Sequence, residues 1–140
     1  MVGRLMFLVD TNVWLELLLG QQKSGEVHEF LSAWPASELG ITEFSLYSVG
    51  IILTRLKKDA AFGNFLADTL EEGGARLLRL DAEGLKAILT VRARFGLDFD
   101  DAYQYVAAEK YNLTLVSFDS DFDRTERGRR TPADVGGAKP

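Results

Sequence analysis

An unbroken apolar run near the start of the chain, Leu5 to Val9, most constrains the fold. Because apolar and polar residues do not alternate, the run predicts a strand buried on both faces, as in a parallel sheet covered by helices. Asp10, Thr11 and Asn12 follow at once, and a helical pattern begins at Val13. Ligands of open α/β sheets bind beyond the carboxyl ends of the strands, so Asp10 is a candidate site residue. The alternative is that Asp10 or Asn12 only caps the next helix.

Helical and strand patterns alternate along the rest of the chain. Helices are expected over 13–19, 25–34, 44–57, 60–70, 82–95 and 102–111, and further strands over 39–42, 75–80 and 113–116. The alternation, without repeat or linker, predicts one α/β domain with a parallel sheet between helices. We expect the domain to occupy residues 1–125. Residues 126–140 lose apolar periodicity, so we expect a flexible C-terminal tail there.

Composition excludes several classes of site. The chain has 140 residues, no cysteine and one histidine, His28. Disulfides, thiolate metal sites and multi-histidine zinc sites within one chain are therefore excluded. With one histidine, metal-free acid–base cleavage of RNA would lack a second proton-transfer group of that type. No leader pattern or apolar run of about 18 residues occurs, which predicts a cytoplasmic protein without a membrane segment.

The charge balance is unusual for a nucleic-acid-binding protein. The net charge is −5, whereas phosphate contacts usually come from Lys and Arg. A divalent cation bound by clustered acids would, however, reverse the local sign. The basic residues form three groups, at 55–58, at 92–94 and at 124–130. Each group is most simply a solvated face, with nucleic-acid contact as the alternative.

Acidic residues gather at the ends of predicted elements: Asp10, then Asp98, Asp100 and Asp101, then Asp119, Asp121 and Asp123. In a parallel sheet Asp10 and Asp119 leave the same edge, whereas the sequence leaves open where the helix at Asp101 points. Converging carboxylates repel one another unless a cation joins them. Mg²⁺ or Mn²⁺ prefers such oxygen ligands and can activate water for phosphoryl displacement.

Simpler interpretations exist for the same residues. Asp100 and Asp101 could be acids placed favourably at a helix N-terminus. The spacing of Asp119, Asp121 and Asp123 is similar to the start of a calcium loop, but the glycine and distant glutamate of that loop are absent. Phe99 and Phe122, beside the acids, are expected to be core anchors.

Three segments together carry a resemblance to a known family. DTNV at 10–13, DFDDA at 98–102 and LVSFDSDFD at 115–123 resemble the PIN-domain ribonucleases of the VapC toxin type. The resemblance covers roughly residues 5–123. It implies a three-layer α/β/α sandwich around a parallel sheet, RNA cleavage that depends on Mg²⁺ or Mn²⁺, and usually a homodimer. A toxin role would further imply a small antitoxin protein as partner.

The resemblance also assigns roles to individual residues. Asp10, Asp101 and Asp119 match acids that hold the metal, and Asn12 and Ser117 match supporting polar positions. Asp121 is expected to support the same site.

The second acid of the family pattern is missing. Ser48 falls where the family has a glutamate, and the nearest acid is Glu43, five residues earlier. Five helical residues rotate by about 140°, so Glu43 could substitute only from the junction of strand and helix. We expect Glu43 to be the substitute and count it among the catalytic residues.

The leading hypothesis is therefore a metal-dependent endoribonuclease, in which a metal-activated water attacks the phosphodiester. The missing glutamate motivates an alternative, a degenerate PIN module that binds RNA or protein without cleaving. An aspartyl-phosphate phosphotransferase or a receiver that uses Asp10 is disfavoured. Phosphatases of this type usually have a second acid two residues after the nucleophile, where this chain has Asn12. The early acidic pair and late lysine of a receiver are also absent.

Overall fold

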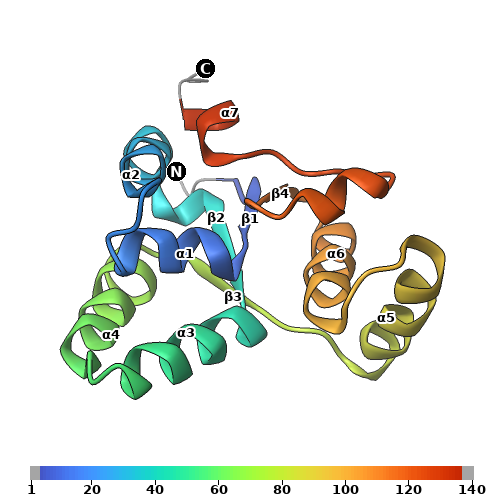
Figure 1. The fold of residues 1–140 in the computed structure, drawn as a ribbon, viewed down its shortest axis with the longest axis horizontal. Helices are drawn as coiled ribbons and strands as arrows, with labels where there is room; N and C mark the ends of the chain where they lie inside the picture. Colours follow the sequence, from blue (N-terminus) through green and yellow to red (C-terminus); the bar gives the residue numbers. More distant parts are fainter. Residues whose placement is uncertain (1–3, 137–140) are drawn as a thin grey trace.

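A parallel four-stranded sheet forms the centre of the protein, in the order β3-β2-β1-β4 (Figure 1). The computed structural model describes residues 4–136. The strands are β1 (Phe7–Val9), β2 (Leu39–Thr42), β3 (Arg76–Leu78) and β4 (Thr114–Val116). β1 pairs with both β2 and β4, so the carboxyl ends of β1 and β4 lie side by side. The predicted parallel sheet is confirmed.

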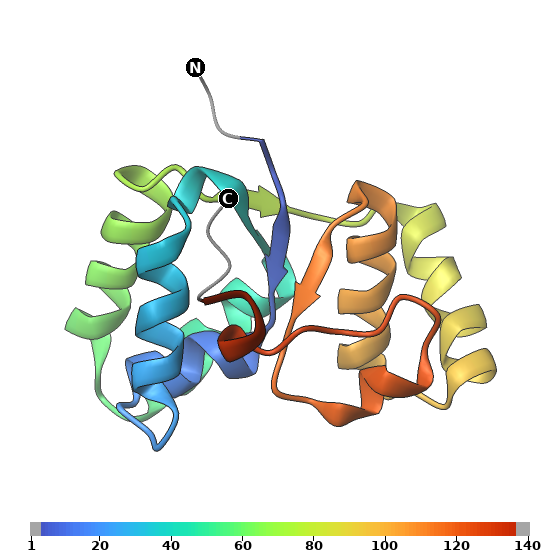
Figure 2. The ribbon, with the colours of Figure 1, turned by 90° about the horizontal axis from the view of Figure 1, so that it is seen from above.

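Helices cover both faces of this sheet (Figure 2). On one face lie α1 (Thr11–Leu18), α2 (Ser24–Ala33), α3 (Glu43–Arg55) and α4 (Asp59–Phe65), and on the other lie α5 (Ala82–Phe95) and α6 (Phe99–Tyr111). Phe7 and Val9 of β1 belong to the first core and Leu8 to the second. This division explains why the apolar run does not alternate, and it confirms the three-layer sandwich. Within residues 4–136, no helix is long and apolar enough to cross a membrane.

Several elements differ at their ends from the predicted bounds. α1 and α6 begin earlier than expected, at Thr11 and Phe99, because Asp10 and Asp98 are their N-cap residues. The helix predicted over 60–70 is α4 followed by a π-helical turn, Leu66–Glu71. Short 3-10 turns occupy Ala36–Glu38 and Ser120–Arg124.

The C-terminal segment is ordered against the domain. The helix α7 (Pro132–Gly136) packs on α2, and the Trp34 Nε1–H donates to the carbonyl of Val135 at 2.9 Å. A parallel bridge joins Val116 to Arg130. The expected flexible tail is therefore wrong for residues 126–136, while residues 137–140 lie outside the described part. This segment has no periodic pattern of apolar residues, because a one-residue bridge and a five-residue helix are too short to produce one.

Candidate metal centre

A cleft of about 340 Å³ opens at the carboxyl ends of β1 and β4. Its lining comes from α1, α3, the start of α6 and the segment after β4, namely Asp10, Thr11, Asn12, Leu15, Phe44, Ser48, Ile52, Asp100, Asp101 and Asp119. Each of the three acidic clusters contributes to this lining. None of these described lining residues is Lys, Arg or His. The structure thus brings Asp10, Asp101 and Asp119 together in a cleft whose described lining has no cationic side chain.

Asp10 is the most buried of these acids, with 5% of its surface exposed. Its Oδ1 accepts from the backbone N–H of Thr11 at 2.8 Å and from Gln104 Nε2 at 2.9 Å, and its Oδ2 accepts from Ser117 Oγ at 2.7 Å. Burial raises the pKa of Asp10 above its ordinary value, and these hydrogen bonds oppose the increase. Asp10 caps α1 and also lines the cleft, so capping does not exclude a role in the site.

Asn12 and Ser117 tie Asp10 to the segment that follows β4. Asn12 Nδ2 lies 3.4 Å from Asp10 Oδ2 and 3.3 Å from Ser117 Oγ, while Asn12 Oδ1 accepts from the Phe118 N–H at 3.2 Å. Ser117 Oγ also accepts from the Asp119 N–H at 3.0 Å. These contacts place both residues beside Asp10, and their supporting role stays a prediction.

Gln104 is a site residue that the sequence interpretation missed. It is 1% exposed, donates through Nε2 to Asp10 and to Ser45 Oγ (2.7 Å), and accepts at Oε1 from Thr42 Oγ1 (2.8 Å). A signal did exist, because Gln104 follows Asp101 by three residues and therefore shares its helix face. The aspartates at the start of α6 indicated a site, whereas the neutral amide of Gln104 by itself did not.

Asp101, Asp119 and Asp121 form the tightest acidic group, each offering a carboxylate oxygen within 4.8 Å of the others. Partial burial, together with the hydrogen bond and charge of Asp119, raises the pKa of Asp101 to about 8. Asp10 is not a member of this group, although its charge also contributes to that increase. Asp121, expected only as support, shares one of its oxygens with Arg124 at 3.0 Å.

Glu43 points to a different set of partners. Its Oε1 lies 3.2 Å from Arg79 Nε, and its Oε2 accepts from the Tyr47 hydroxyl at 2.9 Å. Among the described residues, those lining the cleft include its neighbour Phe44 and Ser48 but not Glu43. Ser48 thus faces the cleft at the place where the family pattern has a glutamate, and the catalytic role of Glu43 stays a prediction.

The remaining residues near the acids differ in their burial and in their contacts. Phe122 is fully buried, as expected of a core anchor, but Phe99 is 46% exposed and that expectation is wrong for it. Phe99 instead packs beside Phe44 and Tyr103 next to the cleft. Asp123 pairs with Arg129 at 3.2 Å, which leaves the calcium-loop interpretation without its third acid.

The donor set fits a hard divalent cation. Asp101 and Asp119 are held close together, the pKa of Asp101 is strongly raised, and the described lining of the cleft has no cationic side chain. These features favour either a shared proton or a bound cation. Oxygen-only ligands in a partly open cleft suit Mg²⁺ or Mn²⁺.

Comparisons with known proteins identify the family. The PIN domain model matches residues 7–128. A toxin–antitoxin complex from Klebsiella pneumoniae is similar in structure, with a TM-score of 0.73 at 20% identity over 91% of this chain and 98% of that one. VapC20 from Mycobacterium tuberculosis, described as a sarcin–ricin loop cleaving toxin, gives a TM-score of 0.71 at 20% identity over 84% and 92%.

FitAcB from Neisseria gonorrhoeae gives a TM-score of 0.74 at 22% identity, over 91% of this chain and 98% of that one. These identities are low, so the similarity to solved structures supports the fold. A search of curated proteins finds no match. The family model, which spans most of the chain and all three acidic clusters, shows that this protein belongs to the PIN domain family.

Proposed function

We propose that this protein is a divalent-metal-dependent endoribonuclease. The observation that carries the proposal is the convergence of Asp10, Asp101 and Asp119 on one cleft that has no cationic residue in its described lining. PIN membership and the VapC toxins among the structural neighbours support nuclease activity and the choice of RNA as substrate.

Asp10, Asp101 and Asp119 would hold Mg²⁺ or Mn²⁺. When bound, such a cation activates a water molecule and neutralises charge on a phosphodiester. Ser117, Asn12 and Gln104 orient the Asp10 carboxylate through the hydrogen bonds described above. Asp121 would support Asp119, whose Oδ1 accepts from the Asp121 N–H at 2.9 Å.

Glu43 would assist this site as the substitute for the acid missing at Ser48. It begins α3 at the end of β2, at the junction from which we expected it to act. To reach the cleft, its side chain would have to leave Arg79 and Tyr47. Arg79 is well exposed, so this ion pair is weak and can be exchanged at small free-energy cost.

We further propose that the protein is the toxin of a toxin–antitoxin pair, acting as a homodimer on RNA in the cytoplasm and restrained by a small antitoxin protein. Structural neighbours described as toxin–antitoxin complexes support this biological role.

The second candidate is a PIN module that binds RNA or protein without cleaving it. Ser48 in the cleft lining favours it, because a hydroxyl cannot supply the negative charge of a fourth acid.

The deciding experiment is cleavage of single-stranded RNA by the purified protein in Mn²⁺, in Mg²⁺ and in EDTA. We expect cleavage only with metal, and a loss of roughly 100-fold or more in Asp10→Asn. Glu43→Gln should reduce the rate about tenfold if Glu43 assists. Asp59→Asn and Glu72→Gln make the same two chemical changes at exposed acids, and they serve as matched controls.

Calorimetric titration of Mn²⁺ accompanies the assay. Absence of both cleavage on a broad RNA panel and metal binding would reject the nuclease and favour the binding module. Full activity in Glu43→Gln would show that the acids of the cleft suffice without it.

A further inference from the structure

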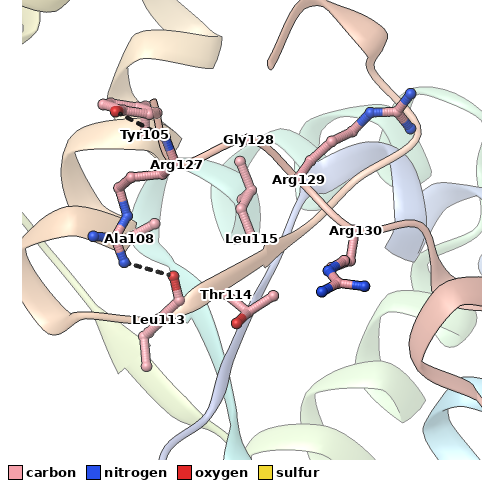
Figure 3. Close-up of a pocket in the computed structure, with 9 residues that line it drawn as sticks. All are labelled: Tyr105, Ala108, Leu113, Thr114, Leu115, Arg127, Gly128, Arg129 and Arg130. Atoms are coloured by element: carbon pink, nitrogen blue, oxygen red, sulfur yellow. Dashed lines mark hydrogen bonds between the residues drawn. The ribbon is translucent and has the colours of Figure 1, made fainter. Parts of the chain in front are cut away.

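A second pocket, of about 360 Å³, lies on the outer side of β4, the terminal strand of the sheet (Figure 3). It is lined by Tyr105, Ala108, Leu113, Thr114, Leu115, Arg127, Gly128, Arg129 and Arg130. Three of these described residues are arginines and none is an acid. The pocket therefore differs in charge from the acidic cleft, and the proposed nuclease mechanism does not use it.

Two of the arginines have contacts that fix the walls of the pocket. Arg129 binds Asp123 through Nε and Nη2, both at 3.2 Å, and the Ser117 carbonyl through Nη1 at 3.1 Å. Its guanidinium points away from the other labelled side chains (Figure 3). Arg127 Nη2 donates to the carbonyl of Leu113 at 3.1 Å, which holds its guanidinium at the pocket wall.

Arg130 has its whole guanidinium available for a ligand, and Arg127 can offer the N–H groups other than its bonded Nη2. The backbone of Arg130 is fixed, because its N–H donates to Leu115 O at 2.8 Å and its carbonyl accepts from the Ser117 N–H at 2.9 Å. Its side chain is exposed and makes no hydrogen bond or ion pair within residues 4–136. The nearby Asp134 carboxylate accepts from the Thr131 N–H at 2.9 Å, and its pKa is lowered mainly by the hydrogen bonds with Thr131 and less by the charge of Arg130.

We propose that this pocket binds a phosphate group, through the guanidinium groups of Arg127 and Arg130 and the hydroxyl of Thr114. Figure 3 shows the exposed Thr114 side chain between Leu113 and Arg130. A guanidinium presents a planar set of donors that matches phosphate oxygens, and it stays charged at all relevant pH values. The pocket volume is sufficient for a nucleotide.

The phosphate could belong to an RNA strand or to a free nucleotide, and the connection to the cleft favours RNA. Ser117 bonds Arg130 through its N–H and Asp10 through its hydroxyl. Ser117 is three positions after Thr114, which is a distance of roughly 10 Å at about 3.3 Å per residue. An RNA strand carries a phosphate on every nucleotide, so one RNA strand can contact both the arginine-lined pocket and the acidic cleft. The choice of RNA rests on the proposed function, whereas the phosphate chemistry does not.

The test measures binding of a fluorescein-labelled single-stranded RNA to the full chain in EDTA, so that no cleavage occurs. Arg130→Gln should weaken binding about fivefold for all RNA sequences, because one exposed charge contact is lost. The slope of log affinity against log salt concentration should fall in magnitude by about 0.7. Arg76→Gln is the matched control, since Arg76 is exposed on β3 at the opposite edge of the sheet.

A second arm titrates AMP into the protein and follows the backbone amide signals of Leu115 and Gly128 by NMR. Weaker RNA binding with a smaller salt slope in Arg130→Gln, but not in Arg76→Gln, supports the site and identifies RNA as the source. Shifts by AMP that Arg130→Gln abolishes, with RNA binding unchanged, support the site with a free nucleotide as ligand. If neither RNA nor AMP binding depends on Arg130, the proposal is overturned.

The binding test is independent of the cleavage assay. Binding that depends on Arg130 in a protein without nuclease activity would retain the pocket and reject the proposed function. Metal-dependent cleavage, together with RNA binding that does not depend on Arg130, would support the proposed function and reject the phosphate-binding pocket.

Discussion

At the scale of single residues, the cleft is defined by carboxylates held in unfavourable surroundings. Asp10 is buried and each of its oxygens accepts a hydrogen bond, whereas Asp101 is half-buried beside Asp119. Each of these environments disfavours the ionised form, and the pKa values of Asp10 and Asp101 are raised accordingly. In the absence of metal, holding these acids together therefore lowers the free energy of unfolding of the protein.

Asp101→Asn should stabilise the metal-free protein in a pH-dependent way. The pKa of Asp101 is about 8 in the folded state against 3.8 for the free side chain. The folded state thus binds the proton more tightly, and the free energy of unfolding decreases as pH rises from about 4 to about 8. Asparagine avoids this loss. After allowance for solvent screening of a half-buried group, we expect a gain of roughly 1 kcal/mol at pH 8 and almost none at pH 4.

Urea unfolding in EDTA at both pH values measures this gain. Mn²⁺ should reverse the order by stabilising the wild type, because it binds the folded state. Asp59→Asn is the control. An equal gain at pH 4 and pH 8 would show that ionisation of Asp101 is not its cause.

At the scale of secondary-structure elements, the site depends on how α6 is held against the sheet. Gln104 of α6 bonds Thr42 at the end of β2, Ser45 in α3 and Asp10 after β1. Thr11 extends the network through its hydroxyl to Ser45 at 2.8 Å. One amide therefore fixes the first turns of α6 and α3 relative to the carboxyl ends of two strands.

Gln104→Leu should reduce the free energy of unfolding by about 2–3 kcal/mol. Leucine has a similar volume, but Asp10, Ser45 and Thr42 would each lose a hydrogen-bond partner in a buried site. Urea denaturation measures the change, and Gln21→Leu on the exposed surface is the control, expected within about 0.5 kcal/mol of wild type. A change in Gln104→Leu no larger than in this control would show that the network adds no stability.

At the scale of the whole molecule, the chain closes on itself through its C-terminal segment. Val135 of α7 is 8% exposed and belongs to the same core as Phe30 and Trp34 of the α2 region. The segment that leads to α7 also forms the arginine-lined pocket beside β4. Residues 126–136 are thus part of the domain, and they connect its first core to the outer edge of the sheet.

Val135→Ala should lower the free energy of unfolding by about 1.5 kcal/mol, because it removes two buried methyl groups and leaves space over α2. Thermal or urea unfolding measures the loss. Leu89→Ala is the control, since Leu89 is 62% exposed and its truncation should change stability little. Equal stability of the Val135→Ala variant and the wild type would mean that α7 does not contribute to the folded core.

Much of the fold was predictable because its signals are local. Apolar runs identified the buried strands, and Gly96 and Asn112 end α5 and α6 in the left-handed conformation expected of such caps. Gly50 shows how a contact with a distant residue accounts for a single residue choice. A Cβ there would lie 2.9 Å from the ring of Phe62, so the missing side chain lets α3 and α4 pack closely at this point.

The sequence by itself determined that Asp10 and Asp119 leave the same edge of the sheet, because each follows a strand of a predicted parallel sheet. The pairing of β1 with β4, which brings the two residues to one cleft, is a tertiary contact. Only the tertiary structure decided the rest of the site. The packing of α6 against the sheet brings Asp101 into the cleft and Gln104 onto Asp10. The direction of Glu43 is set by Arg79, and the order of the C-terminal segment by single contacts with Trp34 and Ser117. These contacts join residues far apart in the chain, and no local periodicity encodes them.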